Sequence, residues 1–379
     1  MKQGDVIAGY RITTPPTNAN GGKCIWAFAE KSGTTYFIKQ FLEPKRPKDD
    51  APDSRSVRIR REVAQEFEER HRTIMKRLRP DARGGGNLVL ATDFFPEGST
   101  YYKVTERIDT SSLEKPQALE AREKMVLLKT LANSLKQLHD IDVVHGDLKP
   151  LNVLVQKRDH AAFYASKLID FDDSYVSGKP PAPEDISGDS AYGAPEWRRY
   201  VQQDGSVEPG QLTCAVDVFA LGLITHLYLT GELPGHDERF GSPADAVNAG
   251  ERLRLDPRLS GEIQGLLRAM VQADPHQRPR MATYLKALSD PKVCALQHRR
   301  PGTGTPEKPP TAPKERPAEG TSTPRASRVR TNLTPRTDTP APRPAPAEPT
   351  PAEPESTPAP RPSRVRINLG DSGRGRKTP

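Results

Sequence analysis

Four polar residues in the middle of the chain have types and spacing that could support chemistry on a phosphate group. The segment HGDLKPLNVLV places a carboxylate at Asp147, an amine at Lys149 and an amide at Asn152. A second carboxylate, Asp170, ends an apolar run eighteen residues after Asn152. A carboxylate can take a proton from a hydroxyl, an amine can steady a moving anion, and carboxylate and amide oxygens suit Mg²⁺. Such a set could carry phosphoryl transfer, which depends on positioning and charge stabilisation more than on covalent catalysis.

With LIDFDDS around Asp170, the order of these residues resembles that of the eukaryotic-type protein kinases, over nearly the whole body of the chain. The resemblance implies that Asp147 orients the attacking hydroxyl and that Lys149 steadies the phosphoryl group. It also implies that Asn152 and Asp170 hold the metal of Mg-ATP, Mg²⁺ or Mn²⁺. The residues DLKPLN favour serine/threonine over tyrosine specificity. The general look of the chain resembles the bacterial eukaryotic-like serine/threonine kinases.

Three later motifs follow in the order of the family. GAPEW matches the segment that closes the activation loop, and DVFALG matches a buried helix whose Asp217 would hold the catalytic loop. QRP supplies Arg278, which by the resemblance pairs with Glu196 of GAPEW. These residues are expected to position the site without touching the reacting atoms.

The resemblance places the ATP site in the β-rich region before the catalytic segment. In YFIKQF, Lys39 takes the place of the phosphate-binding lysine. Thr105 stands at the gatekeeper position of the hinge strand, and the backbone of Glu106 and Ile108 would meet the adenine edge. Leu154 would pack beneath the adenine.

Two departures from the family concern nucleotide binding. The glycine-rich loop is poor, because NANGGK has only Gly21 and Gly22, and glycines normally let the backbone approach the phosphates. Phe37 stands where the family usually has a small alanine. Both changes would weaken ATP affinity, but neither removes a charged catalytic group.

The glutamate that should pair with Lys39 has no clear position. Counting back from Leu78 by the family spacing arrives at His71. Glu68, one turn earlier on the same helix face, is the expected partner of Lys39. The alternative is that the glutamates of this helix are all solvated.

Three substitutions surround the catalytic residues. Gly146 replaces an arginine, so a phosphorylated activation loop has no obvious cation to dock on, and we expect activity without loop phosphorylation. Asp172 replaces the glycine of the metal motif and is expected to change loop flexibility more than charge. Asp189 replaces a threonine, and contact with Lys149 is one role open to it.

The hydrophobic pattern predicts the elements that position these residues. Period-two runs indicate five strands, and apolar stripes indicate one helix at 57–78 and a mainly helical second half. The fold class is therefore α+β, a bilobal protein-kinase fold with an N-lobe at 1–108 and a C-lobe at 109–298. The expected strands are 6–13, 24–30, 35–41, 87–95 and 101–108, and the later helices are 118–139, 212–230, 251–269 and 281–288.

The chain has 379 residues and a net charge of +8, and its composition changes sharply after residue 298. The 16 basic and 8 acidic residues of 299–379 account for all of that charge, and the segment holds 19 of the 39 prolines and no aromatic residue. Without apolar side chains it cannot offset its backbone entropy, so we expect a disordered tail. The neutral body disfavours a nucleic-acid partner.

Other composition features bear on location. No apolar run approaches the length of a membrane span, and the N-terminus lacks the apolar core of a signal peptide. The three cysteines form no CxxC pair, which disfavours a zinc site and fits a reducing cytoplasm. We therefore expect a cytoplasmic protein with no membrane partner.

The tail contains a repeat and many Thr-Pro pairs. PRASRVRTNL at 324–333 recurs as PRPSRVRINL at 360–369, which indicates either a duplication without a role or a peptide that docks twice on a partner domain. Thr-Pro occurs seven times after residue 304, so the tail is a candidate for autophosphorylation. Each phosphate would add about −1.5 to −2 charges.

Three functions are consistent with these residues. The first is a serine/threonine protein kinase that transfers the γ-phosphoryl group of ATP to protein hydroxyls, its own tail included. The second is a pseudokinase scaffold, which the poor glycine loop favours. The third is a small-molecule kinase of the aminoglycoside phosphotransferase type, because HGDxxxxN also occurs in that family. Lys149, Asp217 and Arg278 favour the protein kinase over the third.

Overall fold

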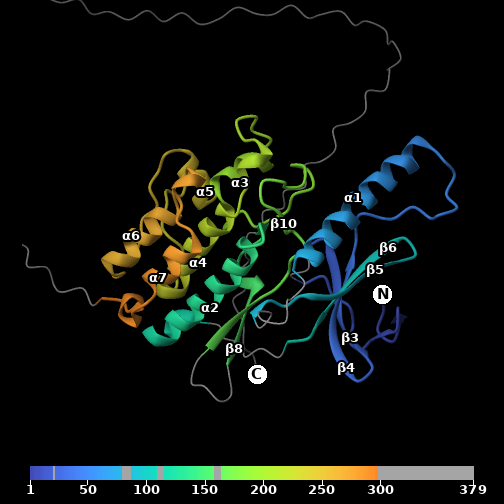
Figure 1. Ribbon diagram of the computed structural model, residues 1–379, viewed down its shortest axis with the longest axis horizontal. Helices are drawn as coiled ribbons and strands as arrows, with labels where there is room; N and C mark the ends of the chain where they lie inside the picture. The colour runs from blue at the N-terminus through green and yellow to red at the C-terminus, as the bar shows by residue number, and fades with distance from the viewer. Residues whose placement is uncertain (20–21, 79–86, 109–114, 158–163, 298–379) are drawn as a thin grey trace, which may run out of the picture. The chain divides into compact units, whose positions relative to one another are not determined.

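The N-terminal part of the protein is built on a six-stranded antiparallel sheet with the order β1-β2-β3-β4-β6-β5 (Figure 1). The computed structural model describes residues 1–19, 22–78, 87–108, 115–157 and 164–297. The strands are β1 Val6–Ile7, β2 Tyr10–Ile12, β3 Cys24–Lys31, β4 Thr34–Phe41, β5 Ala91–Glu97 and β6 Thr100–Glu106.

The sheet has six strands and not the expected five, because the strand expected at 6–13 is divided into two short strands, β1 and β2. Ala8 and Gly9 have φ of 47° and 86°, a left-handed pair that turns the chain back between β1 and β2. β5 begins at Ala91, four residues later than expected. The strands that carry the expected nucleotide residues, β4 and β6, are neighbours in the sheet.

Helix α1, Arg55–Arg77, covers one face of this sheet (Figure 1). It begins at Ser54, whose side chain accepts a hydrogen bond from the backbone N–H of Val57. Phe67 packs with Phe41 and Phe94 of the sheet. Of the expected apolar stripe, Phe67, Ile74 and Leu78 are buried, and only Val63 is exposed.

The second part of the protein is helical, as expected for the fold class. Five leucines of α2 are fully buried and pack against α4 in the main core. The helices are α2 Ala121–His139, α3 Pro195–Val201, α4 Ala215–Thr230, α5 Pro243–Asn248, α6 Gly261–Met270 and α7 Met281–Ala287. Single 3₁₀ turns lie at Pro116–Ala118, Pro150–Asn152, Pro209–Gln211, Pro275–Gln277 and Pro291–Cys294.

Two small sheets hold the catalytic segments between these helices. Strand β7, Val143–Val144, pairs with β10, Tyr175–Val176, and β8, Val153–Lys157, pairs with β9, Tyr164–Leu168. The catalytic segment therefore runs from β7 into β8, and the metal motif begins just after β9. This arrangement brings 145–152 and 169–174 together.

The described residues contain no helix that is both long and apolar enough to cross a membrane. Residues 1–300 form one compact unit. The tail with both repeats lies outside the described residues, as does Gly21.

Candidate active site

The side-chain hydrogen bond and the ion pair of the Asp147 carboxylate both use the same oxygen. Its Oδ2 accepts a hydrogen bond from Asn152 Nδ2 at 3.0 Å and lies 2.8 Å from Lys149 Nζ. Its Oδ1 is buried and has no hydrogen-bond partner among the described residues. Burial raises the pKa of Asp147, although Lys149 opposes the rise. The three residues expected around the attacking hydroxyl thus lie together, with one oxygen available to accept a proton.

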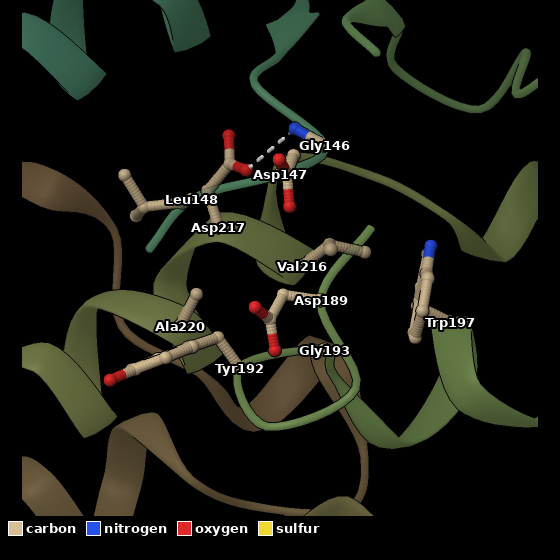
Figure 2. Close-up of a pocket in the computed structure, with 10 residues that line it drawn as sticks. All are labelled: Gly146, Asp147, Leu148, Asp189, Tyr192, Gly193, Trp197, Val216, Asp217 and Ala220. Carbon is tan, nitrogen blue, oxygen red and sulfur yellow. Dashed lines mark hydrogen bonds between the residues drawn. The ribbon is translucent and has the colours of Figure 1, made fainter. Parts of the chain in front are cut away.

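Asp217 of α4 anchors the backbone of the catalytic segment. It accepts hydrogen bonds from the backbone N–H of His145 at 2.8 Å and of Gly146 at 3.2 Å, and the second bond is drawn in Figure 2. Gly146 has a φ of 83°, and a Cβ there would overlap the carbonyl oxygen of Asp173. Glycine is therefore required by the backbone, which gives a structural reason for the loss of the family's arginine.

Two lysines of the sheet meet the metal motif. Lys39 Nζ lies 2.6 Å from Asp170 and 2.9 Å from Asp172, and Lys103 of β6 lies 2.6 Å from the other oxygen of Asp172. Burial alone would raise the pKa of Asp172, but Lys103 and Lys39 outweigh it and hold that pKa well below its ordinary value. The expectation that Asp172 changes flexibility more than charge is wrong, since its charge pairs with both lysines.

The expected pairing of Glu68 with Lys39 is also wrong. Glu68 accepts a hydrogen bond from the hydroxyl of Tyr101 at 2.8 Å and lies 3.6 Å from Arg72. His71, and not Glu68, is buried on the face of the helix toward the sheet. Burial holds the pKa of His71 well below its ordinary value, and its Nε2 has no hydrogen-bond partner among the described residues.

Lys103 was not predicted as a site residue. It stands in the strand sequence TYYKVTE and faces Lys39 directly across the β4–β6 pair. The sequence feature that could have identified it is a lysine between apolar residues, Tyr102 and Val104, at the centre of a strand. Period-two alternation then places Lys103 on the same side of β6 as Thr105, the expected gatekeeper.

The expected adenine region carries large aromatic rings. Phe37 is opposite Thr105 in the sheet, and its ring centroid is 5.1 Å from that of Trp26. Glu106 ends β6, exposed, with half-buried Ile108 two residues later. Half-buried Leu154 lies in β8. Besides Phe37, this region therefore contains a second large ring, Trp26, which was not predicted as part of the site.

The loop before β3 contacts the activation segment. Gly22 has a φ of 55°, and Lys23 Nζ donates a hydrogen bond to Ser187 Oγ at 2.8 Å. Next to it, Cys24 is buried, and burial raises the pKa of its thiol. The glycine-poor loop is thus tied to the opposite side of the site.

A pocket beside Asp147 is lined by the catalytic loop, the loop before α3 and the start of α4 (Figure 2). Asp189 belongs to its lining, and its Oδ2 lies 3.9 Å from Lys149 Nζ. Asp189 therefore does make the contact with Lys149 that the sequence left open. Burial lowers the pKa of Lys149, but Asp147 and then Asp189 outweigh it, so the pKa is raised.

Glu196 at the start of α3 forms a buried ion pair with Arg278, as expected. Arg278 Nη1 and Nη2 lie 2.7 Å from Glu196 Oε1 and Oε2. Arg278 also donates to the carbonyl of Ala215 at the start of α4. The pair ties the activation segment to the helix that carries Asp217.

The residues expected to hold a metal fit Mg²⁺. The amide nitrogen of Asn152 is used by Asp147, which leaves the amide oxygen as the atom for a cation. Asp170 adds a half-buried carboxylate, and burial and Asp172 raise its pKa. No group of three or more His, Cys, Asp or Glu side chains among the described residues could hold a metal ion. Two oxygen ligands suit Mg²⁺, which keeps waters and binds substrate phosphates.

The sequence matches the model of the protein kinase domain over residues 19–288, more than half of the chain. The chain belongs to the protein kinase family. It is 31% identical over 162 residues to serine/threonine-protein kinase ULK3 of Xenopus laevis, covering 42% of this chain and 32% of the relative. It is 26% identical over 217 residues to serine/threonine-protein kinase RAD53 of Saccharomyces cerevisiae, covering 54% of this chain and 26% of the relative.

A third relative of this protein kinase is matched over more of its length. It is the calcium/calmodulin-dependent protein kinase type I of Schizosaccharomyces pombe, 27% identical over 250 residues, with 64% of this chain and 69% of the relative covered. The chain spans only about a third of the first relative and a quarter of the second. All three are eukaryotic proteins, so the resemblance to bacterial kinases stays a prediction.

Proposed function

We propose that the chain is a serine/threonine protein kinase that transfers the γ-phosphoryl group of Mg-ATP to protein hydroxyls. The observation that carries this proposal is the carboxylate of Asp147. Lys149 and Asn152 hold its Oδ2, while its buried Oδ1 has no partner among the described residues. A carboxylate in this state can orient a hydroxyl and accept its proton.

The other residues have roles that follow from their positions. Lys149 lies beside Asp147, where a cation would stabilise charge on the transferred group. Lys39 would bind the phosphates of ATP, and Asn152 and Asp170 would hold Mg²⁺. The bound metal would neutralise charge that develops on the phosphate oxygens. Glu106, Ile108 and Leu154 would position the adenine.

The test is transfer of label from ATP by the wild type and by Asp147→Asn. Acceptors are the protein itself, a casein-like protein and small hydroxyl compounds. We expect label in protein that falls by about 10²-fold or more in the variant, with nucleotide binding retained. Label confined to the small compounds would instead identify a small-molecule kinase and overturn the proposal.

A pseudokinase scaffold is the second candidate, and the aromatic rings favour it. Trp26 and Phe37 lie together on the strands that would face the adenine, and the loop before β3 is poor in glycine. The scaffold predicts no label in any acceptor from either protein. The charged set around Asp147 favours catalysis over this alternative.

The tail is the proposed substrate and docking segment. Its Thr-Pro sites would be phosphorylated by the kinase domain itself, and its two repeats would bind a partner domain as extended peptides. Mass spectrometry after incubation with Mg-ATP tests the first idea, and unmodified tail threonines in an active preparation would reject it. We also propose a cytoplasmic location, with neither nucleic acid nor membrane as partner.

A further inference from the structure

The β4–β6 pair places two lysines directly opposite each other. Lys39 and Lys103 are cross-strand partners, with side chains that are only 14% and 7% exposed. Like charges at opposing positions destabilise a sheet, and a buried ammonium group without an anion costs still more. The sheet therefore needs a carboxylate between these lysines.

Asp172 supplies that carboxylate from the other part of the protein. Its Oδ2 lies 2.9 Å from Lys39 Nζ and its Oδ1 lies 2.6 Å from Lys103 Nζ, so each oxygen serves one lysine. The side chain of Asp172 is 13% exposed, which keeps both contacts away from screening by water.

Helix α1 provides no carboxylate to this cluster among the described residues. The position that faces it holds His71, whose ring packs 4.3 Å from that of Phe67 and 4.8 Å from that of Phe94. Glu68 is engaged by Tyr101 instead. A neutral imidazole among aromatic rings cannot fix the position of an ammonium group as an anion does.

We infer that Asp172, which bridges the two lysines, is a positioning residue for Lys39 beside the closer carboxylate of Asp170, and that Lys103 is the second cation that binds Asp172. The inference rests on the proposed function, in which Lys39 binds the phosphates of ATP. It means that the lysine and the metal ligand Asp170 are fixed by one short segment, because Asp170 and Asp172 are two residues apart. A shift of α1 would then leave the ion pair of Lys39 intact.

The experiment compares Asp172→Asn, Lys103→Met and the double variant with the wild type. Asp93→Asn, which removes a half-buried carboxylate bound to Tyr10 in the same sheet, is the control. We expect Asp172→Asn to lower kcat/KM by about 10²-fold, as a misplaced catalytic group does, and to weaken ADP binding measured in EDTA. The control should change neither.

Thermal unfolding without nucleotide provides a second readout that does not depend on activity. Asp172→Asn should lower the unfolding midpoint in the wild-type background. It should lower the midpoint less when Lys103 is already Met, because the Lys103 ammonium group that would be left without an anion is then absent. Equal shifts in the two backgrounds would overturn the pairing. If no preparation transfers phosphate, the proposed function is rejected. The unfolding measurement would still test the pairing of Asp172 with Lys103.

A rescue separates positioning from general stability. Adding His71→Glu to Asp172→Asn supplies a carboxylate from α1, and we expect at least a tenfold recovery of kcat/KM, or about 1.4 kcal/mol of the barrier. Asp172→Asn with wild-type kcat/KM and ADP affinity, in a protein that Asp147→Asn inactivates, would overturn the inference and leave the proposed function standing. The same loss with and without the added glutamate would also overturn it.

Discussion

Arg278 and Glu196 join two segments that are far apart in sequence through a two-pronged ion pair that is almost completely buried. A buried pair that loses one member leaves an uncompensated charge, at a cost of about 3–5 kcal/mol. We therefore expect Arg278→Ala to lower the free energy of unfolding by about that amount, measured in urea. Exposed Arg280→Ala is the matched control and should stay close to the wild type. A loss as small as that of the control would contradict the importance of the pair.

Gly146 should not tolerate a side chain. Its φ of 83° alone costs a non-glycine residue about 1–2 kcal/mol, and its Cβ would also overlap the backbone of Asp173. We expect Gly146→Ala to destabilise the protein by more than that and to lower kcat, because the segment that carries Asp170 must shift.

Gly178→Ala separates the two causes. Gly178 has a φ of 76°, but a Cβ there would lie 3.5 Å from its nearest neighbour. It should show the backbone cost alone and keep its kcat. Equal losses of kcat in the two variants would refute steric overlap as the cause at Gly146.

Removing the ring of Phe37 should improve nucleotide binding. Phe37→Ala would vacate the space beside Trp26 on the expected adenine side of the sheet. We expect the KM for ATP to fall by about three- to tenfold, or roughly 0.6–1.4 kcal/mol. Tyr36→Ala alters the adjacent residue, which faces the opposite side of the same strand, and should bring no such gain. A higher KM in Phe37→Ala would indicate that the ring binds the base.

Activation should not need phosphate on the activation segment. Ser174 donates its hydroxyl to the carbonyl of His145 and is buried, and Tyr175 is buried, so substitutions there test packing. Of the half-buried serines, Ser177 accepts a hydrogen bond from the backbone N–H of Cys214, so its substitution also tests packing, and Ser187 and Ser190 are the remaining candidates. We expect the double alanine variant to keep kcat within about twofold of wild type in a peptide assay, since Gly146 provides no arginine next to Asp147 through which a phosphate could act on the catalytic segment. A tenfold loss that a phosphatase reproduces in the wild type would contradict this.

His226 should make stability depend on pH. Its Nε2 accepts a hydrogen bond from the backbone N–H of Asp256, so its Nδ1–H donates to the carbonyl of Glu232 at 2.7 Å. Burial lowers its pKa, although Glu232 and Asp256 oppose this. The unfolded chain therefore binds the proton more readily, and stability should fall as the pH drops below about 6.5.

The measurement is the free energy of unfolding between pH 5 and pH 8. His226→Gln should reduce the slope below about pH 6.5, where one proton contributes at most about 1.4 kcal/mol per pH unit. Exposed His276→Gln is the control. A slope that is the same in His226→Gln and in the wild type would exclude this residue as the cause.

The catalytic residues could be predicted because they are close in sequence. Asp147, Lys149 and Asn152 lie within six residues, and their spacing is set by one turn between β7 and β8. The helix expected at 251–269 begins only at Gly261, and Ser260, whose side chain caps it, was the signal for its start. Residues close together in sequence were therefore enough to predict the catalytic segment, and they also held the signal for the correct start of this helix.

The pairing of Lys39 could not be predicted in the same way. Its partner Asp172 is 133 residues away, and the face of α1 toward the sheet presents His71 in place of a carboxylate. Helix periodicity located the buried stripe of Phe67, Ile74 and Leu78, but a stripe does not show which anion binds a lysine on the neighbouring sheet. The family spacing pointed to His71, which is the residue that packing buries toward the sheet, and the helix-face argument that favoured Glu68 was wrong.

The reactivity of the buried thiol of Cys24 can be used to measure local opening of the protein. Cys24 lies one residue beyond Lys23, which bridges to Ser187, and its raised pKa keeps the thiolate fraction small. Because Cys24 is buried in a cluster with Phe41 and Phe67, a thiol reagent would reach it only in molecules in which this packing has opened. The alkylation rate of Cys24 would then report how often this packing opens, and a nucleotide that stabilises it would slow the reaction.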